Sequence, residues 1–173
     1  AYNKSVEKNN EIIFYNPLYI DKGYTLMANK NSGLKTFEEI ERMIQPREKA
    51  WSSTIWQLKG KKISVSPKTL SEQFLKKLLI KTEITESDIT ILYQELDKGF
   101  KAFMDGRTDL YFANEAQAAV AMKEGHIALF RNETLSMEII SGISTTREYA
   151  INNDSTLKGL INTWYSCIEY INK

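Results

Sequence analysis

Residues 60–113 read GKKISVSPKTLSEQFLKKLLIKTEITESDITILYQELDKGFKAFMDGRTDLYFA. Three β-rich runs, at residues 63–66, 89–93 and 109–113, alternate with two segments whose apolar residues recur at helical spacing. The first helical segment has a clear apolar face, made by Leu70, Phe74, Leu75, Leu78 and Leu79. This order predicts a βαβαβ unit with parallel strands and right-handed crossovers.

The carboxyl ends of these strands are the expected place for a ligand, because open α/β sheets bind ligands beyond those ends. Residues 66–71 follow the first strand and residues 114–117 follow the third. Thr69 and Glu72 have the spacing of a capping box, which predicts a helix N-terminus directly after the first strand. Its unpaired amides and the helix dipole would suit a sulfonate, carboxylate or phosphate. The alternative left open is a self-satisfied cap that uses these donors itself.

The composition excludes several classes of function. The chain has 173 residues, 42% hydrophobic and 26% charged, with a net charge of +1, which is typical of a globular protein and argues against a nucleic-acid partner. The single cysteine excludes a multi-cysteine metal site, and the single histidine is too few for a typical zinc site. No P-loop, nucleophile elbow or dinucleotide fingerprint is present in the sequence. We therefore expect a protein that is not an enzyme and that needs no metal or cofactor.

The single cysteine and the single histidine are each predicted to have a structural place. Cys167 lies in an apolar helical pattern, which predicts a buried thiol. His126 follows Gly125, so we expect it in a turn at the surface.

The segments outside this unit also form short predicted elements. Residues 12–15 are predicted to form a strand that ends in a turn at Asn16 and Pro17. Thr36 and Glu39 complete a capping box, which predicts a helix over residues 37–44. Further strands are predicted at residues 24–28, 127–130 and 137–144. We expect a mostly parallel sheet of about five strands, with helices on both faces and the strand at 137–144 inserted antiparallel.

The final helix is predicted to begin near residue 155 and to end near residue 171. Its apolar residues form one stripe, made by Leu157, Leu160, Ile161, Trp164, Ile168 and Ile171. Such a stripe needs a partner surface, so the helix is expected to bury it against structure outside residues 60–130 or against another chain.

Three segments carry a resemblance to a known family: GKKISVSPKTLSEQFLKKLL at 60–79, ITESDITIL at 84–92 and FMDGRTDLYFANEAQAA at 103–119. Together they resemble the second lobe of a two-lobed, periplasmic-binding-protein-like solute-binding protein of an ABC importer. The most similar group serves alkanesulfonates, taurine, nitrate and thiamine-precursor pyrimidines. The family's Gly-x-x-Asp turn is found here at residues 106–109. By pattern the resemblance covers residues 24–150.

The resemblance also points to ligand-binding residues. Family members carry an aromatic-Glu-Pro segment that lines the cleft after the third strand; here Glu115 matches the Glu, whereas Asn114 and Ala116 replace the aromatic residue and the proline. A carboxylate at Glu115 would accept hydrogen bonds from an amine, or would only compensate a helix N-terminus. The candidate ligand-binding residues are Ser66, Lys68, Thr69, Leu70, Ser71, Asn114 and Glu115.

The resemblance implies a division into lobes. Residues 1–23 are expected to be a remnant of the first lobe, residues 24–144 the second lobe, and residues 145–173 helices that return to the first lobe. Residues 41–58 depart from the family as an insertion that contains Trp51 and Trp56. These two aromatic residues would form a partner surface or, as we favour, pack the insertion onto its own domain. Because little sequence precedes residue 12, the chain is expected to be a truncated relative.

The function implied by the resemblance is the binding of a small anionic or amino-substituted solute outside the cytoplasm, for delivery to the permease of an ABC importer. One alternative is a ligand-sensing domain on a membrane signalling protein, such as a histidine kinase or a cyclase. Another is an enzyme of thiamine-pyrimidine-precursor biosynthesis. The expected location is periplasmic or extracellular, with membrane association through a partner or an anchor.

Overall fold

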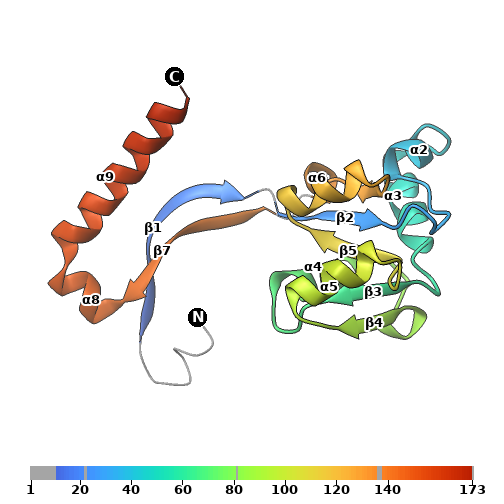
Figure 1. Cartoon of the computed structure of the whole chain (residues 1–173), viewed down its shortest axis with the longest axis horizontal. Coiled ribbons are helices and arrows are strands. Elements are labelled where there is room, and N and C mark those ends of the chain that lie inside the picture. Colours follow the sequence, from blue (N-terminus) through green and yellow to red (C-terminus); the bar gives the residue numbers. More distant parts are fainter. Residues whose placement is uncertain (1–10, 22, 81, 136–137, 173) are drawn as a thin grey trace. The chain divides into compact units, whose positions relative to one another are not determined.

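The computed structural model describes residues 11–21, 23–80, 82–135 and 138–172 (Figure 1). These residues form two compact units. Unit 1 comprises residues 11–21 and 138–172, and unit 2 comprises the described residues between 22 and 137. The expectations stated above for residues 1–10, 22 and 137 lie outside the described part of the chain.

Unit 2 is built on a five-stranded sheet with the order β4-β3-β5-β2-β6. Its strands are β2 (Thr25–Ala28), β3 (Lys62–Val65), β4 (Thr90–Tyr93), β5 (Leu110–Ala113) and β6 (Ile127–Phe130). β3 pairs parallel with both β4 and β5, whereas β2 pairs antiparallel with both β5 and β6. The expected fold class, a mostly parallel five-stranded sheet with one antiparallel strand, is confirmed.

The identity of the antiparallel strand was predicted wrongly. It is β2, and the strand predicted at 137–144 instead pairs with β1 in unit 1. The reason is burial: Leu26, Met27 and Ala28 of β2 are fully buried apolar residues, as a strand covered on both faces requires. The segment Ile139–Thr146 carries serine, glycine and threonine between its isoleucines and is nowhere fully buried, so it fits a two-stranded ribbon.

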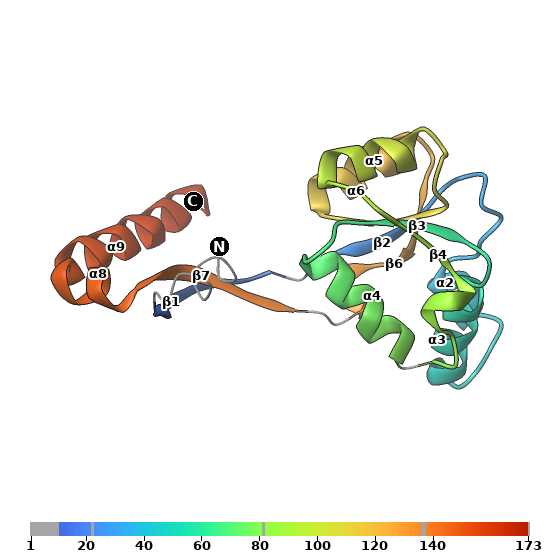
Figure 2. The same cartoon turned by 90° about the horizontal axis from the view of Figure 1, so that it is seen from below.

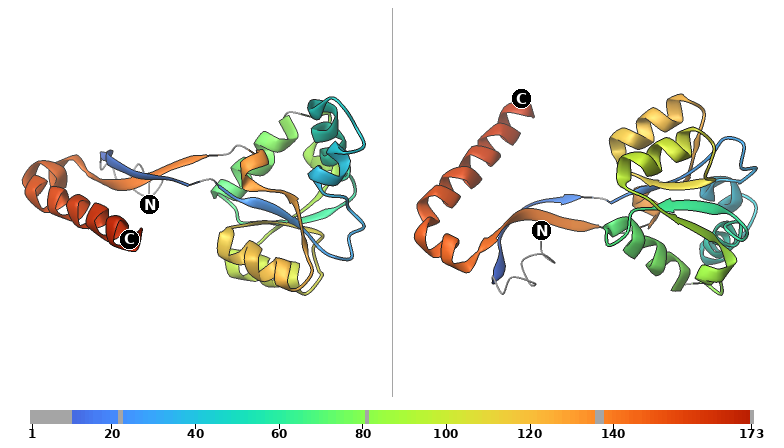
Figure 3. Two further views of the ribbon diagram at one scale, coloured as in Figure 1. Left: turned by 90° about the horizontal axis from the view of Figure 1, so that it is seen from above. Right: turned by 60° about the horizontal axis from the view of Figure 1, so that its bottom comes forward.

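Helices cover both faces of this sheet (Figure 2). α5 (Leu96–Met104) and α6 (Glu115–Lys123) lie on one face, and α4 (Leu70–Ile80), α2 (Phe37–Glu41) and α3 (Arg47–Trp56) lie on the other, as both views of Figure 3 also show. The 3-10 helix η1 (Glu86–Asp88) precedes β4, and the short α7 (Asn132–Leu135) follows β6.

The core of unit 2 has one layer on each side of the sheet. Under α5 and α6, Met27, Phe103 and Tyr111 pack with alanines of α6 and of the strands β5 and β6. On the other face, Phe112 contacts Phe74 of α4 at 6.4 Å between ring centroids, and Phe130 contacts Phe37 of α2 at 5.5 Å. Neighbouring residues of β5 therefore point to opposite faces, as the pleat of a strand requires.

The predicted Gly-x-x-Asp turn closes α5 and ties β5 to β3. Gly106 has a positive φ of 72°, and its amide donates to the carbonyl of Phe103, so the helix ends there as expected. Asp109 then bridges the starts of the two parallel strands. Its amide donates to the carbonyl of Lys62, and one of its carboxylate oxygens accepts from the amide of Lys62 at 2.8 Å.

The segment expected to be an insertion, residues 41–58, contains α3 and packs onto unit 2. The ring of Trp51 lies 5.7 Å from that of Phe130, which confirms the favoured interpretation for this residue. Trp56 is partly exposed, and the amino group of Lys59 lies 4.6 Å from its ring centroid. The capping box that opens α2 is formed as predicted, with Thr36 and Glu39 bonding each other's amides at 3.2 and 2.7 Å.

Unit 1 consists of a two-stranded antiparallel sheet and two helices. β1 (Ile12–Asp21) pairs with β7 (Ile139–Thr146), and α8 (Arg147–Asn152) and α9 (Asp154–Ile171) follow. The predicted turn at Asn16 and Pro17 is wrong, because β1 continues through them with two register shifts. At this irregularity a Cβ on Gly142 would stand 2.1 Å from the carbonyl oxygen of Asn16, so only glycine permits the observed approach of the two backbones.

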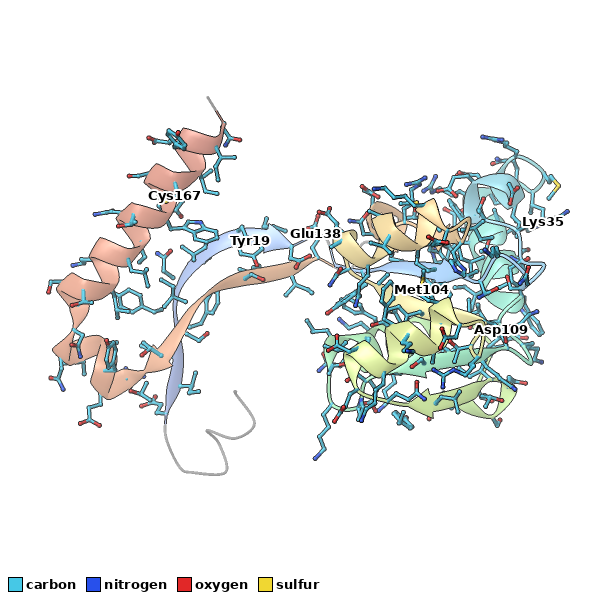
Figure 4. The ribbon with its side chains drawn as sticks, viewed as in Figure 1. Tyr19, Lys35, Met104, Asp109, Glu138 and Cys167 are labelled. Atoms are coloured by element: carbon cyan, nitrogen blue, oxygen red, sulfur yellow. The ribbon has the colours of Figure 1, made fainter. Side chains whose placement is uncertain are left out.

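The apolar stripe of α9 is mostly uncovered in the described residues. Leu157 is buried, but Leu160, Trp164 and Ile168 are 54%, 37% and 40% exposed. The expected burial of this stripe against the rest of the chain is therefore not found among the described residues beyond Leu157. Cys167 is likewise exposed rather than buried (Figure 4), because the helix around it has no covering partner among the described residues. No helix in the described ranges is both long and apolar enough to span a membrane.

Candidate functional site

The carboxyl ends of β3 and β5 lie side by side in the sheet. The two strands are parallel neighbours, with Ser64 opposite Tyr111. β3 also pairs with β4 on its other side, and α4 and α5 lie on opposite faces of the sheet (Figure 2). This is the topological switch point of the sheet, where open α/β folds bind ligands. Because β3 and β5 are neighbours, residues 66–71 and Asn114 follow strands that end at the same edge, as the sequence predicts.

The loop after β3 is held by its own side chains. The Thr69 hydroxyl donates to the carbonyl of Ser66 at 2.6 Å and lies 2.8 Å from the Ser71 hydroxyl. The Glu72 carboxylate accepts from the amide of Lys68 at 2.6 Å and from the amino group of Lys76 at 2.9 Å. These bonds hold the pKa of Glu72 below its usual value, chiefly through the bond from Lys76 and then through the amide of Lys68.

The capping box predicted from Thr69 and Glu72 does not form as expected. Lys68 takes a positive φ of 59°, which turns its amide toward Glu72, so this carboxylate bonds residue 68 instead of residue 69. The Thr69 hydroxyl is turned to a carbonyl and does not cap the helix. Within the described part of the chain, the backbone amides of Thr69, Leu70 and Ser71 donate to no protein acceptor. The hydroxyls are therefore used internally, whereas the first amides of α4 are free.

A second helix N-terminus follows β5. Asn114 caps α6: its side-chain oxygen accepts from the amide of Gln117 at 2.9 Å, and the Gln117 side chain accepts from the amide of Asn114 at 3.3 Å. This box occupies the side-chain oxygen of Asn114. Glu115 lies in the first turn of α6 and is exposed. Its carboxylate forms no ion pair among the described residues, so it is available to a ligand.

Tyr24 is a residue at this edge that the sequence did not indicate. β2 runs antiparallel to β5, and Thr25 pairs with Ala113, so Tyr24 lies beside the point where β5 ends. Its ring contacts that of Phe74 on α4 edge-on, at 5.5 Å between centroids. An aromatic residue is thus present near Asn114. Tyr24 lies at this edge only because β2 runs antiparallel to β5, and the short sequence of β2 does not reveal the direction of the strand.

Two polar side chains on β3 and β5, close to the ends of these strands, bond to the segment that follows β4. The hydroxyl of Ser64 on β3 donates to the side-chain oxygen of Gln94, just after β4, at 3.2 Å. The Tyr111 hydroxyl donates to the carbonyl of Leu96 at 3.2 Å. Burial raises the pKa of the Tyr111 phenol, which keeps it protonated and able to donate.

His126 lies at the other end of the strands, where β5 and β6 begin. It directly precedes β6, whose start pairs with Ala28, the residue that also pairs with the start of β5. Contrary to expectation its side chain is buried: the ring packs 4.7 Å from that of Phe103, and its Nδ1 accepts from the amide of Lys30 at 3.3 Å. Burial lowers its pKa. Among the described residues no three His, Cys, Asp or Glu side chains are grouped to hold a metal ion.

Comparison with solved structures agrees with this fold. The periplasmic aliphatic sulphonate-binding protein SsuA from Escherichia coli superposes with a TM-score of 0.66 and 19% identity, over 92% of this chain and 49% of that one. A putative periplasmic sulfonate-binding protein from Methylobacillus flagellatus gives 0.67 and 16%, over 98% and 46%. The alkanesulfonate-binding protein from Xanthomonas axonopodis, bound to MOPS, gives 0.65 and 19%, over 94% and 51%.

This chain spans about half the length of each of those proteins. No curated protein sequence matches it closely enough to count as a relative. The sequence profile described as NMT1/THI5 like matches residues 34–171, which is most of the chain and includes α4, α6 and the loops before them. The resemblance found in the sequence is thereby confirmed, and the chain belongs to the NMT1/THI5-like family.

Proposed function

We propose that this chain binds a small solute outside the cytoplasm, as part of a two-lobed protein that delivers the solute to an ABC importer. The observation that carries the proposal is the pairing of two helix N-termini at one edge of the sheet. α4 contributes the free amides of Thr69, Leu70 and Ser71, and α6 contributes the exposed carboxylate of Glu115. The family and the periplasmic binding proteins of similar fold support the same proposal.

The proposed solute carries an anionic group and an amine. Free amides at a helix N-terminus favour an anion, and Lys68 and Ser66 lie in the loop beside them. Glu115 favours a cationic or amino group. Tyr24 offers the face of a ring next to both. An amino-sulfonate, an amino acid or an amino-substituted heterocycle satisfies all three features.

In this proposal unit 2 is the second lobe, and unit 1 is part of the first lobe together with the chain segments that link the lobes. Solute binding then shifts the population from open to closed arrangements of the two lobes. The protein partner would be the permease of the importer, and the place of action would be the periplasm or the cell exterior. The three solved proteins are described as sulfonate-binding proteins, and two of them as periplasmic, which supports transport over the sensory and biosynthetic alternatives.

We propose that the chain binds its solute without catalysing a reaction, because of the chemical groups found at the carboxyl ends of β3 and β5. Among the described residues, the groups gathered there are backbone amides, hydroxyls, an amide side chain, the amine of Lys68 and the exposed carboxylate of Glu115. The single histidine is buried at the other end of the strands and cannot serve as a base for a ligand at these carboxyl ends.

The test is a titration of the ¹⁵N-labelled chain with taurine, with glycine and with an aminopyrimidine, followed by NMR. We expect the amide signals of residues 66–71 and 114–117 to shift with one of these probes. Leu70→Pro removes one free amide at the first helical position, where proline is tolerated. Leu70→Ala is its matched control, since it loses the same side chain and keeps the amide.

The expected result is an affinity at least fivefold weaker for Leu70→Pro and for Glu115→Gln, roughly 1 kcal/mol, with Leu70→Ala close to the wild type. If a probe binds and neither Leu70→Pro nor Glu115→Gln weakens it by more than about twofold, the site lies elsewhere. If all three probes leave every signal unchanged, the proposed solute class is wrong.

A further inference from the structure

The first turn of α4 already holds a carboxylate that belongs to the chain itself. One oxygen of Glu72, Oε2, accepts from the amide of Lys68 at 2.6 Å, and the other, Oε1, accepts from the amino group of Lys76 at 2.9 Å. These bonds, first that from Lys76, lower the pKa of the Glu72 carboxyl, so it is ionised at neutral pH. The helix dipole favours this charge for the same reason that it favours a solute anion.

The bond between Lys68 and Glu72 is made at the expense of a strained backbone. Among the described residues, Lys68 is the one non-glycine residue with a positive φ. A residue with a Cβ adopts this conformation only when its surroundings compensate for the strain. The Thr69 hydroxyl does not supply the compensation, because it bonds the carbonyl of Ser66. The conformation of the loop therefore depends on the Glu72 carboxylate.

Glu72 can leave the Lys68 amide and still keep a partner. Its two oxygens have separate donors, and the pair with Lys76 lies one turn along α4, away from the loop. The Lys76 side chain is 52% exposed, so it can follow the carboxylate as it moves. Once released, the Lys68 amide joins the free amides of residues 69–71, and its backbone can relax to a negative φ.

We infer that Glu72 is an internal competitor for the anion at the start of α4. A solute anion that reaches the amides of residues 69–71 meets the charge of Glu72 and displaces this carboxylate from the Lys68 amide. Because like-charge repulsion grows with the charge of the solute, Glu72 disfavours a dianion more than a monoanion. The inference rests on the proposed function, since it assigns the selectivity of that same site.

The experiment compares the wild-type chain with Glu72→Gln, which removes the charge and nearly keeps the shape, and with Glu72→Ala, which also removes the acceptor. Each ¹⁵N-labelled protein is titrated with inorganic sulfate and with taurine at constant ionic strength. Glu83→Gln is the matched control, because Glu83 is exposed in the segment that follows α4, so the same charge is removed at the other end of the helix. Circular dichroism checks that each variant keeps its helices.

We expect Glu72→Gln to bind sulfate at least about fivefold more tightly than the wild type, with a smaller gain for the monoanionic group of taurine. Glu83→Gln should change the affinity for sulfate less than about twofold, because water and salt screen a charge at that distance.

The backbone of Lys68 provides a readout that needs no ligand. A strong NOE between the amide proton and the Hα of one residue marks a positive φ. This NOE should be strong for Lys68 in the wild type and weak in Glu72→Ala, because the bond that holds the strained backbone is gone. Saturation of the wild type with taurine should weaken it as well.

Three results would overturn the inference. One is sulfate that binds Glu72→Gln no more tightly than the wild type. Another is an equal gain for Glu83→Gln, which would reflect the net charge of the chain alone. The last is a Lys68 NOE that stays strong in Glu72→Ala. A gain for sulfate in a chain that binds none of taurine, glycine and the aminopyrimidine would instead uphold the role of Glu72 and contradict the proposed solute class.

Discussion

Gly99 permits the close approach of α5 to β3, and replacing it with alanine should destabilise unit 2. A Cβ at this position would stand 2.7 Å from the Ser64 hydroxyl oxygen and 3.3 Å from the Tyr111 ring. Alanine gains about 1 kcal/mol of helix propensity. Overpacking costs roughly 1–3 kcal/mol, and turning the hydroxyl away loses about 1 kcal/mol of its bond to Gln94. The expected net loss is about 1–3 kcal/mol.

Urea unfolding measures this loss. In a Trp164→Phe background the tryptophan fluorescence comes only from Trp51 and Trp56, both of which belong to unit 2. Gly159→Ala is the matched control in α9, where a Cβ meets nothing within 4 Å. It should gain about 1 kcal/mol of local helix stability, seen as greater helicity by circular dichroism.

A second variant isolates the contact. Ser64→Ala removes the hydroxyl that the new Cβ of Gly99→Ala would meet, so the double variant should recover at least half of the stability lost on adding alanine alone. The reasoning is refuted if Gly99→Ala leaves unit 2 as stable as the wild type or makes it more stable, or if the two substitutions are simply additive.

Three further predictions concern stability and pH. Gly142→Ala should cost roughly 1–3 kcal/mol in the β1–β7 sheet, because its Cβ would meet the Asn16 carbonyl, and hydrogen exchange of these amides should speed up; unchanged exchange would contradict this. Lys68→Gly should raise the free energy of unfolding of unit 2 by about 1 kcal/mol, because lysine is strained at this positive φ and glycine is not. The loss of the lysine charge should also weaken the binding of any anion at α4. A lower urea midpoint for the variant would contradict the proposed strain. Burial holds the pKa of His126 below its ordinary 6.5, so its contribution to stability is complete above that pH and is lost as pH falls through the folded value. Urea midpoints on either side of pH 6.5 should show this loss, and His126→Gln should remove it.

The part of the fold that sequence predicts well is the part with strong periodicity. β3, β4 and β5 lie within a residue of their predicted ranges, α4 contains every residue of the predicted apolar face, and α5 lies between the second and third strands as predicted. Their order also implied parallel pairing, and this in turn placed residues 66–71 beside Asn114. The direction of β2 did not follow, because a strand of four residues with three apolar ones in a row shows no period and fits either direction.

The candidate site was predicted in position and only partly in detail. The spacing of Thr69 and Glu72 predicts a capping box. It does not reveal that Lys68 adopts a left-handed backbone conformation and that its amide donates to the Glu72 carboxylate. Tyr24 was missed because its nearness to Asn114 depends on a long-range strand pairing. Cys167 was predicted to be buried because apolar residues at helical spacing indicate a helix face that favours burial. The spacing does not reveal whether a surface that covers this face is present.

The place of β2 has a consequence for how unit 2 is synthesised. Leu26 leaves the ribosome before the other strands of the sheet, and its neighbours Phe112 and Phe130 emerge roughly a hundred residues later. The β3–β4 pair has both of its strands available much sooner. The apolar β2 segment must therefore wait, unpaired and accessible to chaperones, until nearly all of unit 2 has emerged. Completion of the sheet is thus a late event that translation itself delays.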